Sequence, residues 1–153
     1  QLETNRVRPF TYSHNDTVAN YTHYNQPLAH PLGANFQEGI GIVRYQPAPK
    51  WYVYLQAIYS YKGLDSAGIN YGGNIFRDYS TRSMSNGYKI GSGDKAKVFN
   101  AFLQVSYEIK ENIFFEISGQ YRNFKSLTNP TASNTTMVTA GVRMNMFTRQ
   151  YDY

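Results

Sequence analysis

All three histidines of the chain lie in one polar segment, residues 12–36. Ser13 and His14 are adjacent there and Asp16 follows closely, so the segment contains the residue types of a serine hydrolase. A general base must reach its nucleophile through side-chain geometry, and adjacent side chains of an extended chain point to opposite sides. The spacing therefore argues against hydrolysis, including lipid hydrolysis. We predict no catalytic residue and no enzyme.

The histidine spacing does not resemble a metal site either. His14, His23 and His30 are separated by nine and seven residues, and no carboxylate recurs beside them. Structural zinc sites use closer and repeated ligand spacings. The chain has no cysteine, which excludes thiolate ligands and disulfides. We predict no metal site and no cofactor, and the simplest role of these histidines is hydrogen bonding to loop backbone.

The same segment is rich in tyrosine and asparagine, which leaves two interpretations open. Tyrosine and histidine rings stack on sugar faces, while amides and hydroxyls satisfy sugar hydroxyl groups, so the segment could contact a glycan or a partner. Alternatively it folds over or into a lumen and holds itself by hydrogen bonds, with Pro27, Pro31 and Gly33 setting its turns. The candidate contact residues are Tyr12, His14, Tyr21, His23, Tyr24 and His30.

The elements that position this segment are predicted from alternating apolar and polar residues. Four stretches alternate with a period of two, and these are residues 50–62, 98–110, 113–125 and 136–148. Such alternation predicts strands with one apolar and one polar face, and no helical stripe forms. Two weaker strands are expected at residues 1–12, where Pro9 cannot donate to a ladder, and at 36–45, where Ile40 and Ile42 share one parity. The chain is therefore predicted to be all-β, with six antiparallel strands.

The connections between these strands alternate in length. Two are short, "QPAPK" and "KEN", and three are long, at residues 13–35, 63–95 and 126–135. Outer-membrane barrels have short periplasmic turns and longer loops outside. We therefore predict an antiparallel transmembrane β-barrel whose outside loops are the three long segments. The alternative is a soluble β-sandwich whose apolar face is core, but a sandwich has no reason to sort its loops by side.

Aromatic residues occupy the positions that membrane girdles would need. Trp51 and Tyr59 lie eight residues apart on one face of their strand. At ~3.3 Å per residue and a tilt near 40°, they are separated by about 20 Å along the membrane normal. This separation approaches the ~25 Å apolar band between girdles. The predicted girdle residues are Trp51, Tyr59, Phe99, Tyr107, Phe115 and Tyr121, with Tyr107 and Phe115 at the lower girdle and Phe99 and Tyr121 at the upper one.

Six strands are too few to close a barrel, since single-chain bacterial barrels start at eight. Either a strand is hidden in residues 63–95, with 69–77 as the candidate, or the chain is the C-terminal part of a larger barrel. We favour the second interpretation, in which residues 1–153 are one β-barrel domain. The start at Gln-Leu-Glu, with no visible signal peptide, fits a mature terminus or a piece of a longer protein.

Charge and hydropathy exclude two further classes. The net charge of +5 is modest and the basic residues are scattered without a run of five, so we expect no nucleic-acid partner. No stretch approaches the ~18 apolar residues of a membrane helix. Only 16% of the residues are charged and 16% are aromatic. This composition suits strands with one lipid-facing and one water-facing side.

One stretch carries a resemblance to a known family. "RVRPFTYSHNDTVANYTHYNQPLAHPLGANFQE", residues 6–38, resembles a motif in outer-membrane barrels of the Wzi-like capsule-assembly group, closest to Bacteroidota members that include gliding-motility RemB-like proteins. In that group a Tyr-Thr-His stretch and a His-Pro-Leu-Gly stretch lie in the C-terminal third of the barrel. Here they are residues 21–23 and 30–33, and "NYGGNIF" at 70–76 is similar to a later loop of the group.

The resemblance implies a large barrel in the outer membrane of a Gram-negative bacterium. It implies a non-catalytic role in cell-envelope or surface-polysaccharide (capsule) assembly or attachment. The motility-labelled members imply an alternative, which is an accessory or structural subunit of a gliding- or secretion-related complex without a glycan ligand. The implied partners are outer-membrane lipid, surface polysaccharide and other outer-membrane proteins.

Overall fold

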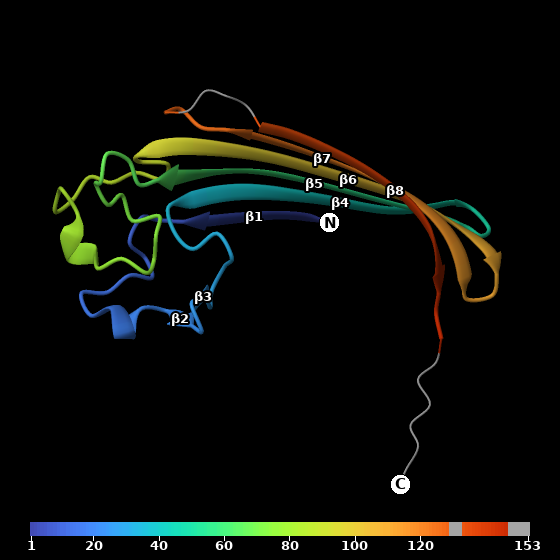
Figure 1. Ribbon diagram of the computed structural model, residues 1–153, viewed down its shortest axis with the longest axis horizontal. Coiled ribbons are helices and arrows are strands. Elements are labelled where there is room, and N and C mark those ends of the chain that lie inside the picture. The colour runs from blue at the N-terminus through green and yellow to red at the C-terminus, as the bar shows by residue number, and fades with distance from the viewer. Residues whose placement is uncertain (129–132, 147–153) are drawn as a thin grey trace, which may run out of the picture.

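A curved six-stranded antiparallel sheet dominates the protein (Figure 1). The computed structural model describes residues 1–128 and 133–146. The strands are β1 (Leu2–Val7), β2 (Thr22–His23), β3 (Gln26–Pro27), β4 (Phe36–Ala48), β5 (Trp51–Leu64), β6 (Asp94–Lys110), β7 (Ile113–Lys125) and β8 (Ser133–Met144), and the 3-10 helices are η1 (Thr17–Ala19) and η2 (Tyr79–Thr81). The main sheet has the order β1-β4-β5-β6-β7-β8, and β2 and β3 form a separate small hairpin.

The prediction of an all-β chain with six antiparallel strands is confirmed for this sheet. The sheet is not closed into a barrel, because β1 and β8 are its two edges and do not pair with each other. Six strands cannot wrap into the rings that begin at eight in single-chain outer-membrane barrels. Residues 69–77 do not supply a further strand, since this part of the chain contributes only the isolated bridges Ser66–Ile69 and Asn70–Arg82.

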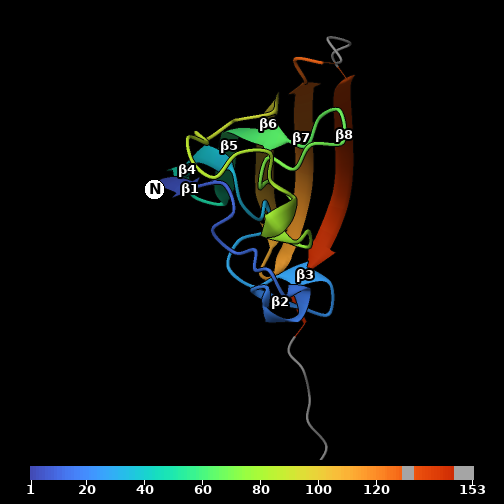
Figure 2. The ribbon, with the colours of Figure 1, turned by 90° about the vertical axis from the view of Figure 1, so that its left-hand side faces the viewer.

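The short and long connections lie at opposite ends of the sheet (Figure 1). The β4–β5 turn consists of Pro49 and Lys50, and the β6–β7 turn consists of Glu111 and Asn112. Lys50 and Asn112 both have positive φ, at 69° and 62°. Gly is the default residue for such a conformation, and Asn adopts it more readily than most other residues. The long segments that precede β4 and β6 emerge at the other end, which Figure 2 views directly.

The strand register separates an apolar face from a polar face. One row across the sheet joins Trp51, Tyr107, Phe115 and Val142, and another row joins Leu55, Leu103, Gly119 and Val138. The six predicted girdle side chains belong to this apolar face, and their exposed fractions run from 37% for Tyr107 to 49% for Tyr59. The Trp51 and Tyr107 rings lie 4.9 Å apart, and the Phe99 and Tyr121 rings 6.4 Å apart.

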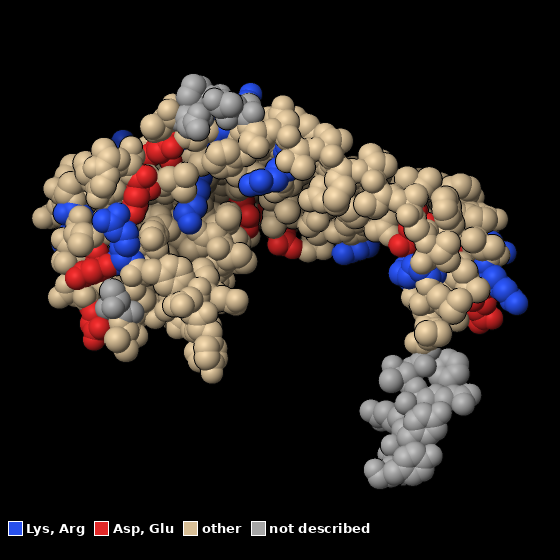
Figure 3. Space-filling view, viewed as in Figure 1, with Lys and Arg blue, Asp and Glu red and all other residues tan. Residues whose placement is uncertain are grey.

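The apolar face is the outside of the arch, because the long loops pack on the opposite, concave face (Figures 1 and 3). Over the described ranges, no second layer of the chain covers the apolar face. Among residues 1–128 and 133–146, no helix is both long and apolar enough to cross a membrane.

Two weak predictions are sharpened by the structure. The first strand is shorter than residues 1–12, since β1 ends at Val7 before Pro9. In β4, Ile40 and Ile42 pair with Ile58 and Gln56 and share the concave face, so the outer face of that strand carries the alternate residues. Parts of two predicted segments lie outside the described residues, namely 129–132 of the loop at 126–135 and 147–148 of the strand at 136–148.

Candidate functional site

Two long loops, residues 8–35 and 65–93, fold together against the concave face at one end of the sheet, and we call them the loop cap (Figures 1 and 2). The two loops are joined directly by backbone hydrogen bonds. The Phe10 N–H donates to the Gly72 carbonyl at 3.1 Å, and the Tyr79 N–H donates to the His14 carbonyl at 3.4 Å. The loop cap is therefore one packed unit built from segments far apart in the sequence.

Asn35 stands at the centre of the loop cap and is fully buried. Its Nδ2 donates to the carbonyls of Gly63 at 3.2 Å, Tyr71 at 3.1 Å and Ser92 at 2.9 Å. Its Oδ1 accepts from the Gly91 N–H at 2.7 Å. One side chain thus connects β5 near its end with two separate parts of the 65–93 loop. Its own backbone has φ of 60°, a conformation that asparagine tolerates.

Gly63 leaves room for that amide. A Cβ atom at Gly63 would lie 2.1 Å from the Ser92 carbonyl oxygen and 2.2 Å from Asn35 Nδ2. Real side chains do not approach backbone so closely, so residue 63 must lack a side chain for the network to form. Asn35 and Gly63 are therefore a matched pair, although 28 residues separate them.

A second buried asparagine orders the 65–93 loop internally. Asn70 is fully buried, and its Nδ2 donates to the Asp78 carbonyl at 3.1 Å and to Thr81 Oγ1 at 2.9 Å. Its Oδ1 accepts from the Gly72 N–H at 2.8 Å. Asp65 adds an ion pair with Arg77, with 2.7 Å between Oδ2 and Nη1. Buried backbone groups need partners, and here side-chain amides supply them in place of a sheet ladder.

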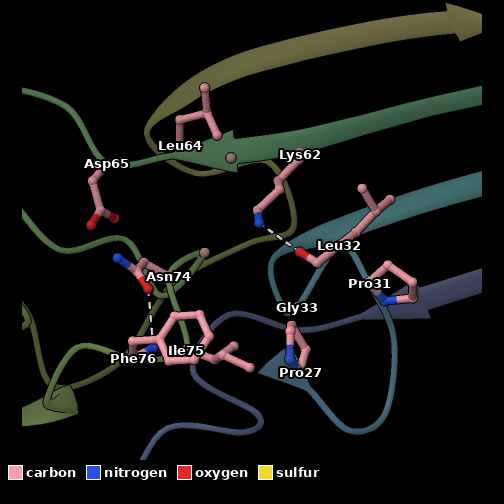
Figure 4. A pocket seen from close by; sticks show the side chains of 12 residues that line it. Pro27, Pro31, Leu32, Gly33, Lys62, Leu64, Asp65, Asn74, Ile75 and Phe76 are labelled. Atoms are coloured by element: carbon pink, nitrogen blue, oxygen red, sulfur yellow. Dashed lines mark hydrogen bonds between the residues drawn. The ribbon is translucent and has the colours of Figure 1, made fainter. Parts of the chain in front are cut away.

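A pocket of about 390 Å³ opens where the loop cap meets the end of β5 (Figure 4). Its apolar wall includes Pro27, Pro31, Ile75 and Phe76, and its polar groups include Lys62, Asp65 and Asn74. Small-molecule sites occupy this volume range and combine an apolar lining with a few polar groups.

Lys62 is the only cation in the pocket lining given by the described residues. Its Nζ donates to the Leu32 carbonyl at 2.5 Å, which ties β5 to the 8–35 loop (Figure 4). Burial lowers the pKa of the Lys62 ammonium, and the charge of Asp65 partly opposes this shift. Lys62 lies at the loop end of β5, beyond the 51–59 stretch that separates the aromatic rows.

Four of the predicted contact residues form two exposed or half-exposed ring pairs. The Tyr12 and Tyr21 rings lie 5.8 Å apart, and the Tyr21 N–H donates to the Tyr12 carbonyl. The His23 and Tyr24 rings lie 4.3 Å apart at the tip of the β2–β3 hairpin. Tyr24 and Asn25 have φ of 47° and 57°, as a tight two-residue hairpin turn requires. Tyr24 is 89% exposed, so its ring can meet a ligand.

His30 has internal partners instead. Its ring stacks on Phe36 with centroids 4.5 Å apart, and Nε2 lies 2.7 Å from Glu38 Oε1. The Leu32 N–H donates to His30 Nδ1 at 3.2 Å, so in the neutral ring the proton is on Nε2 and is donated to Glu38. His30 therefore docks the 8–35 loop onto β4. The structure places it at a contact inside the protein, away from the exposed ring pairs.

The side chains of Ser13 and His14 lie in different environments, as expected for adjacent residues of an extended chain. Ser13 is buried while His14 is exposed, and Ser13 Oγ has no hydrogen-bond partner in the described part of the chain. The His14 N–H donates to Asn20 Oδ1 at 2.5 Å, which folds the turn around η1. His14, His23 and His30 are not brought together, and the described residues contain no group of three metal-ligating side chains.

We expect His30→Ala to destabilise the loop cap by about 1–3 kcal/mol, the cost of leaving a buried partner without its hydrogen bond. The Glu38 side chain is only 6% exposed and would keep Asn5 Nδ2 as its remaining donor. This loss is measured by urea unfolding, monitored by the rate at which a protease cleaves the 8–35 loop. His14→Ala is the matched control because His14 is exposed, and equal stability of the two variants would contradict the docking role.

Sequence reasoning did not find Asn35, Gly63, Asn70 or Lys62. Each is an ordinary loop or strand-end residue in the sequence, and its importance comes from contacts with distant segments. The one available signal was the glycine-rich "NYGGNIF" stretch, whose asparagine is Asn70. In comparisons with known proteins, no family model, no curated protein and no solved structure matches this chain.

Proposed function

We propose that the chain is part of an outer-membrane β-barrel of a Gram-negative bacterium, of the Wzi-like capsule-assembly type. In this proposal it assembles or attaches surface polysaccharide without catalysing a reaction. The observation that carries the proposal is the apolar outer face of the sheet, which no second layer of the described residues covers and which is bounded by aromatic residues towards both ends. The concave face carries the charged side chains Arg44, Glu116 and Arg143, and the loop cap packs on it at one end (Figure 1).

The spacing of the aromatic residues supports a membrane-spanning sheet. Trp51, Tyr107 and Phe115 form one row, and Tyr59 and Phe99 form a second row eight residues away along β5. A rise of ~3.3 Å per residue and a tilt near 40° separate these rows by about 20 Å along the normal. Aromatic belts at both interfaces suit rings that have an apolar body and a polar edge. A soluble sandwich would instead bury this face against a second sheet.

Glycan contact is supported by the exposed rings of the loop cap. Tyr21, His23 and Tyr24 are all exposed, and they lie on the small hairpin and beside it. Rings held on a short, well-defined turn lose little conformational freedom on binding, which favours stacking on a sugar face. The loop cap would then present them on the outer side of the membrane.

A second candidate function is an accessory or structural subunit of a gliding- or secretion-related outer-membrane complex. The observation that favours it is the internal use of the polar side chains in the loop cap. Asn35, Asn70 and His30 direct their hydrogen bonds to the protein itself. A loop cap of this kind closes the concave face whether or not a glycan is present.

We expect replacement of Tyr21, His23 and Tyr24 by alanine to release surface polysaccharide into the medium. Each lost ring contact is worth about 0.5–1.5 kcal/mol, so the affinity should fall roughly tenfold or more. The measurement is the ratio of cell-bound to released polysaccharide. Val18→Ala, at an exposed position of the same loop, is the control.

The difference in mobility between boiled and unboiled samples shows whether each variant still folds. Unchanged polysaccharide retention by a folded triple variant would reject glycan contact and favour the accessory role. A protein that is soluble without detergent and shows no heat shift would reject the membrane barrel itself.

A further inference from the structure

The concave face of the sheet contains a second pocket, at the end away from the loop cap. Its volume is about 470 Å³, and β4, β5, β6, β7 and β8 all contribute to it. The polar and aromatic side chains that line it include Arg44, Tyr52, Tyr54, Gln104, Glu116 and Arg143. It faces the hollow beneath the arch seen in Figure 3. None of the residues predicted as glycan contacts from the sequence belongs to it.

The charges of this pocket leave one guanidinium without a carboxylate. Arg143 is paired with Glu116, at 2.9 Å between Nε and Oε1, and Ser106 Oγ donates to the same oxygen. Arg44 makes no ion pair among the described residues, and its guanidinium carbon lies 5.4 Å from the Tyr54 ring centroid. Glu108 of β6 accepts from the Tyr52 hydroxyl at 3.3 Å.

The remaining lining groups match a sugar ring. Tyr52 and Tyr54 offer aromatic faces, while Gln46 and Gln104 offer amide donors and acceptors. Arginine presents a planar set of donors that binds a carboxylate with two parallel hydrogen bonds. Its contact with the face of Tyr54 restricts the guanidinium without using up those donors. A free guanidinium beside aromatic faces and amides is therefore suited to a sugar that carries a carboxylate.

We propose that this pocket binds a uronate unit of an acidic polysaccharide, with Arg44 on the carboxylate and Tyr54 beside the sugar ring. The inference rests on the proposed barrel for its location, which would be the lumen near the short turns. It adds the class of the substrate, which is an acidic glycan. It also adds a binding site at the end of the sheet opposite to the loop cap. A chain bound here would enter from the short-turn side before it meets the exposed rings.

The test is direct binding of oligogalacturonate by the protein extracted from outer membranes in detergent, with a malto-oligosaccharide of equal length as the neutral probe. Arg44→Gln should weaken oligogalacturonate binding about tenfold or more, since hydrogen bonds to charged groups are the stronger ones. Arg122→Gln is the matched control. Arg122 lies on the same face of the sheet but outside this pocket, and its replacement removes the same charge. It should change the affinity less than about twofold.

Three results would overturn the inference. These are equal weakening by Arg44→Gln and Arg122→Gln, equal affinity for the neutral probe, and absence of oligogalacturonate binding by a heat-shifting, folded barrel. The heat shift of the same samples keeps the two proposals apart. A folded barrel that fails to bind rejects the pocket alone, whereas a protein that binds without forming a barrel rejects the proposed function and keeps the pocket.

Discussion

Leu103→Arg should prevent the sheet from entering a membrane, whereas Gln104→Arg should be tolerated. Leu103 lies midway along β6 on the outer face, between Leu55 of β5 and Gly119 of β7, and its side chain is 45% exposed. An arginine on the lipid face of a barrel costs about 2–4 kcal/mol at the bilayer midplane. Gln104 is the next residue along the strand, so its side chain points to the concave face, where it lies beside other polar side chains such as Ser106 and Glu116.

The measurement is refolding into lipid vesicles, followed by the heat shift and by protection of the strands from protease. The wild type and Gln104→Arg should fold alike, and Leu103→Arg should lose most of its folded fraction. The opposite pattern would refute a lipid-facing surface. A soluble protein would gain solubility from an arginine in place of an exposed leucine, and it would be disturbed more by a charge at Gln104.

Asn35→Ala should open the loop cap while leaving the sheet folded. The buried amide serves three carbonyl groups and one N–H, and each buried group left without a partner costs about 1–3 kcal/mol. Alanine also tolerates positive φ poorly, which adds about 1–2 kcal/mol. The sum exceeds the roughly 3 kcal/mol that corresponds to a hundredfold change in the open population.

Trypsin cleavage in the 65–93 loop, at Arg82 or Lys89, should therefore accelerate at least about a hundredfold, because local opening governs access to the protease. Asn35→Gly separates the two causes, since glycine accepts positive φ but lacks the amide. Asn15→Ala controls for the loss of an exposed asparagine in the 8–35 loop. Protection that survives in Asn35→Gly would show that the amide network does not hold the loop cap.

The sequence alone was sufficient for the six strands of the main sheet and for most of their faces, whereas the short β2–β3 hairpin was not predicted. Period-two alternation is a local property, because successive side chains of a strand point to opposite sides whatever the partner is. The stretches at 98–110 and 113–125 therefore predicted both β6 and β7 and the outer position of Leu103 and Phe115. The length of each connection can also be read from the local sequence. The placement of short and long connections at opposite ends of the sheet was therefore predictable too.

Local alternation was not enough to assign the two faces of β4, because glycines interrupt its apolar pattern. In β4, Gly39 and Gly41 have no side chains to mark a face, and Ile40 and Ile42 share the concave side with Arg44. Only the pairing with β5 assigns these residues to a face, because a register fixed by the neighbouring strand determines every side chain of β4 at once.

The two pockets and the loop cap were decided by tertiary structure. Asn35 acquires its role from carbonyl groups that lie 28, 36 and 57 residues later in the chain. Arg44 and Arg143 line one pocket although they belong to β4 and β8, because the sheet is curved and brings its separated strands around a common hollow. The sequence determined which residues are polar and which strands they occupy. The curvature and the loop packing decided which of those residues meet, since contacts between distant segments depend on the path of the whole chain.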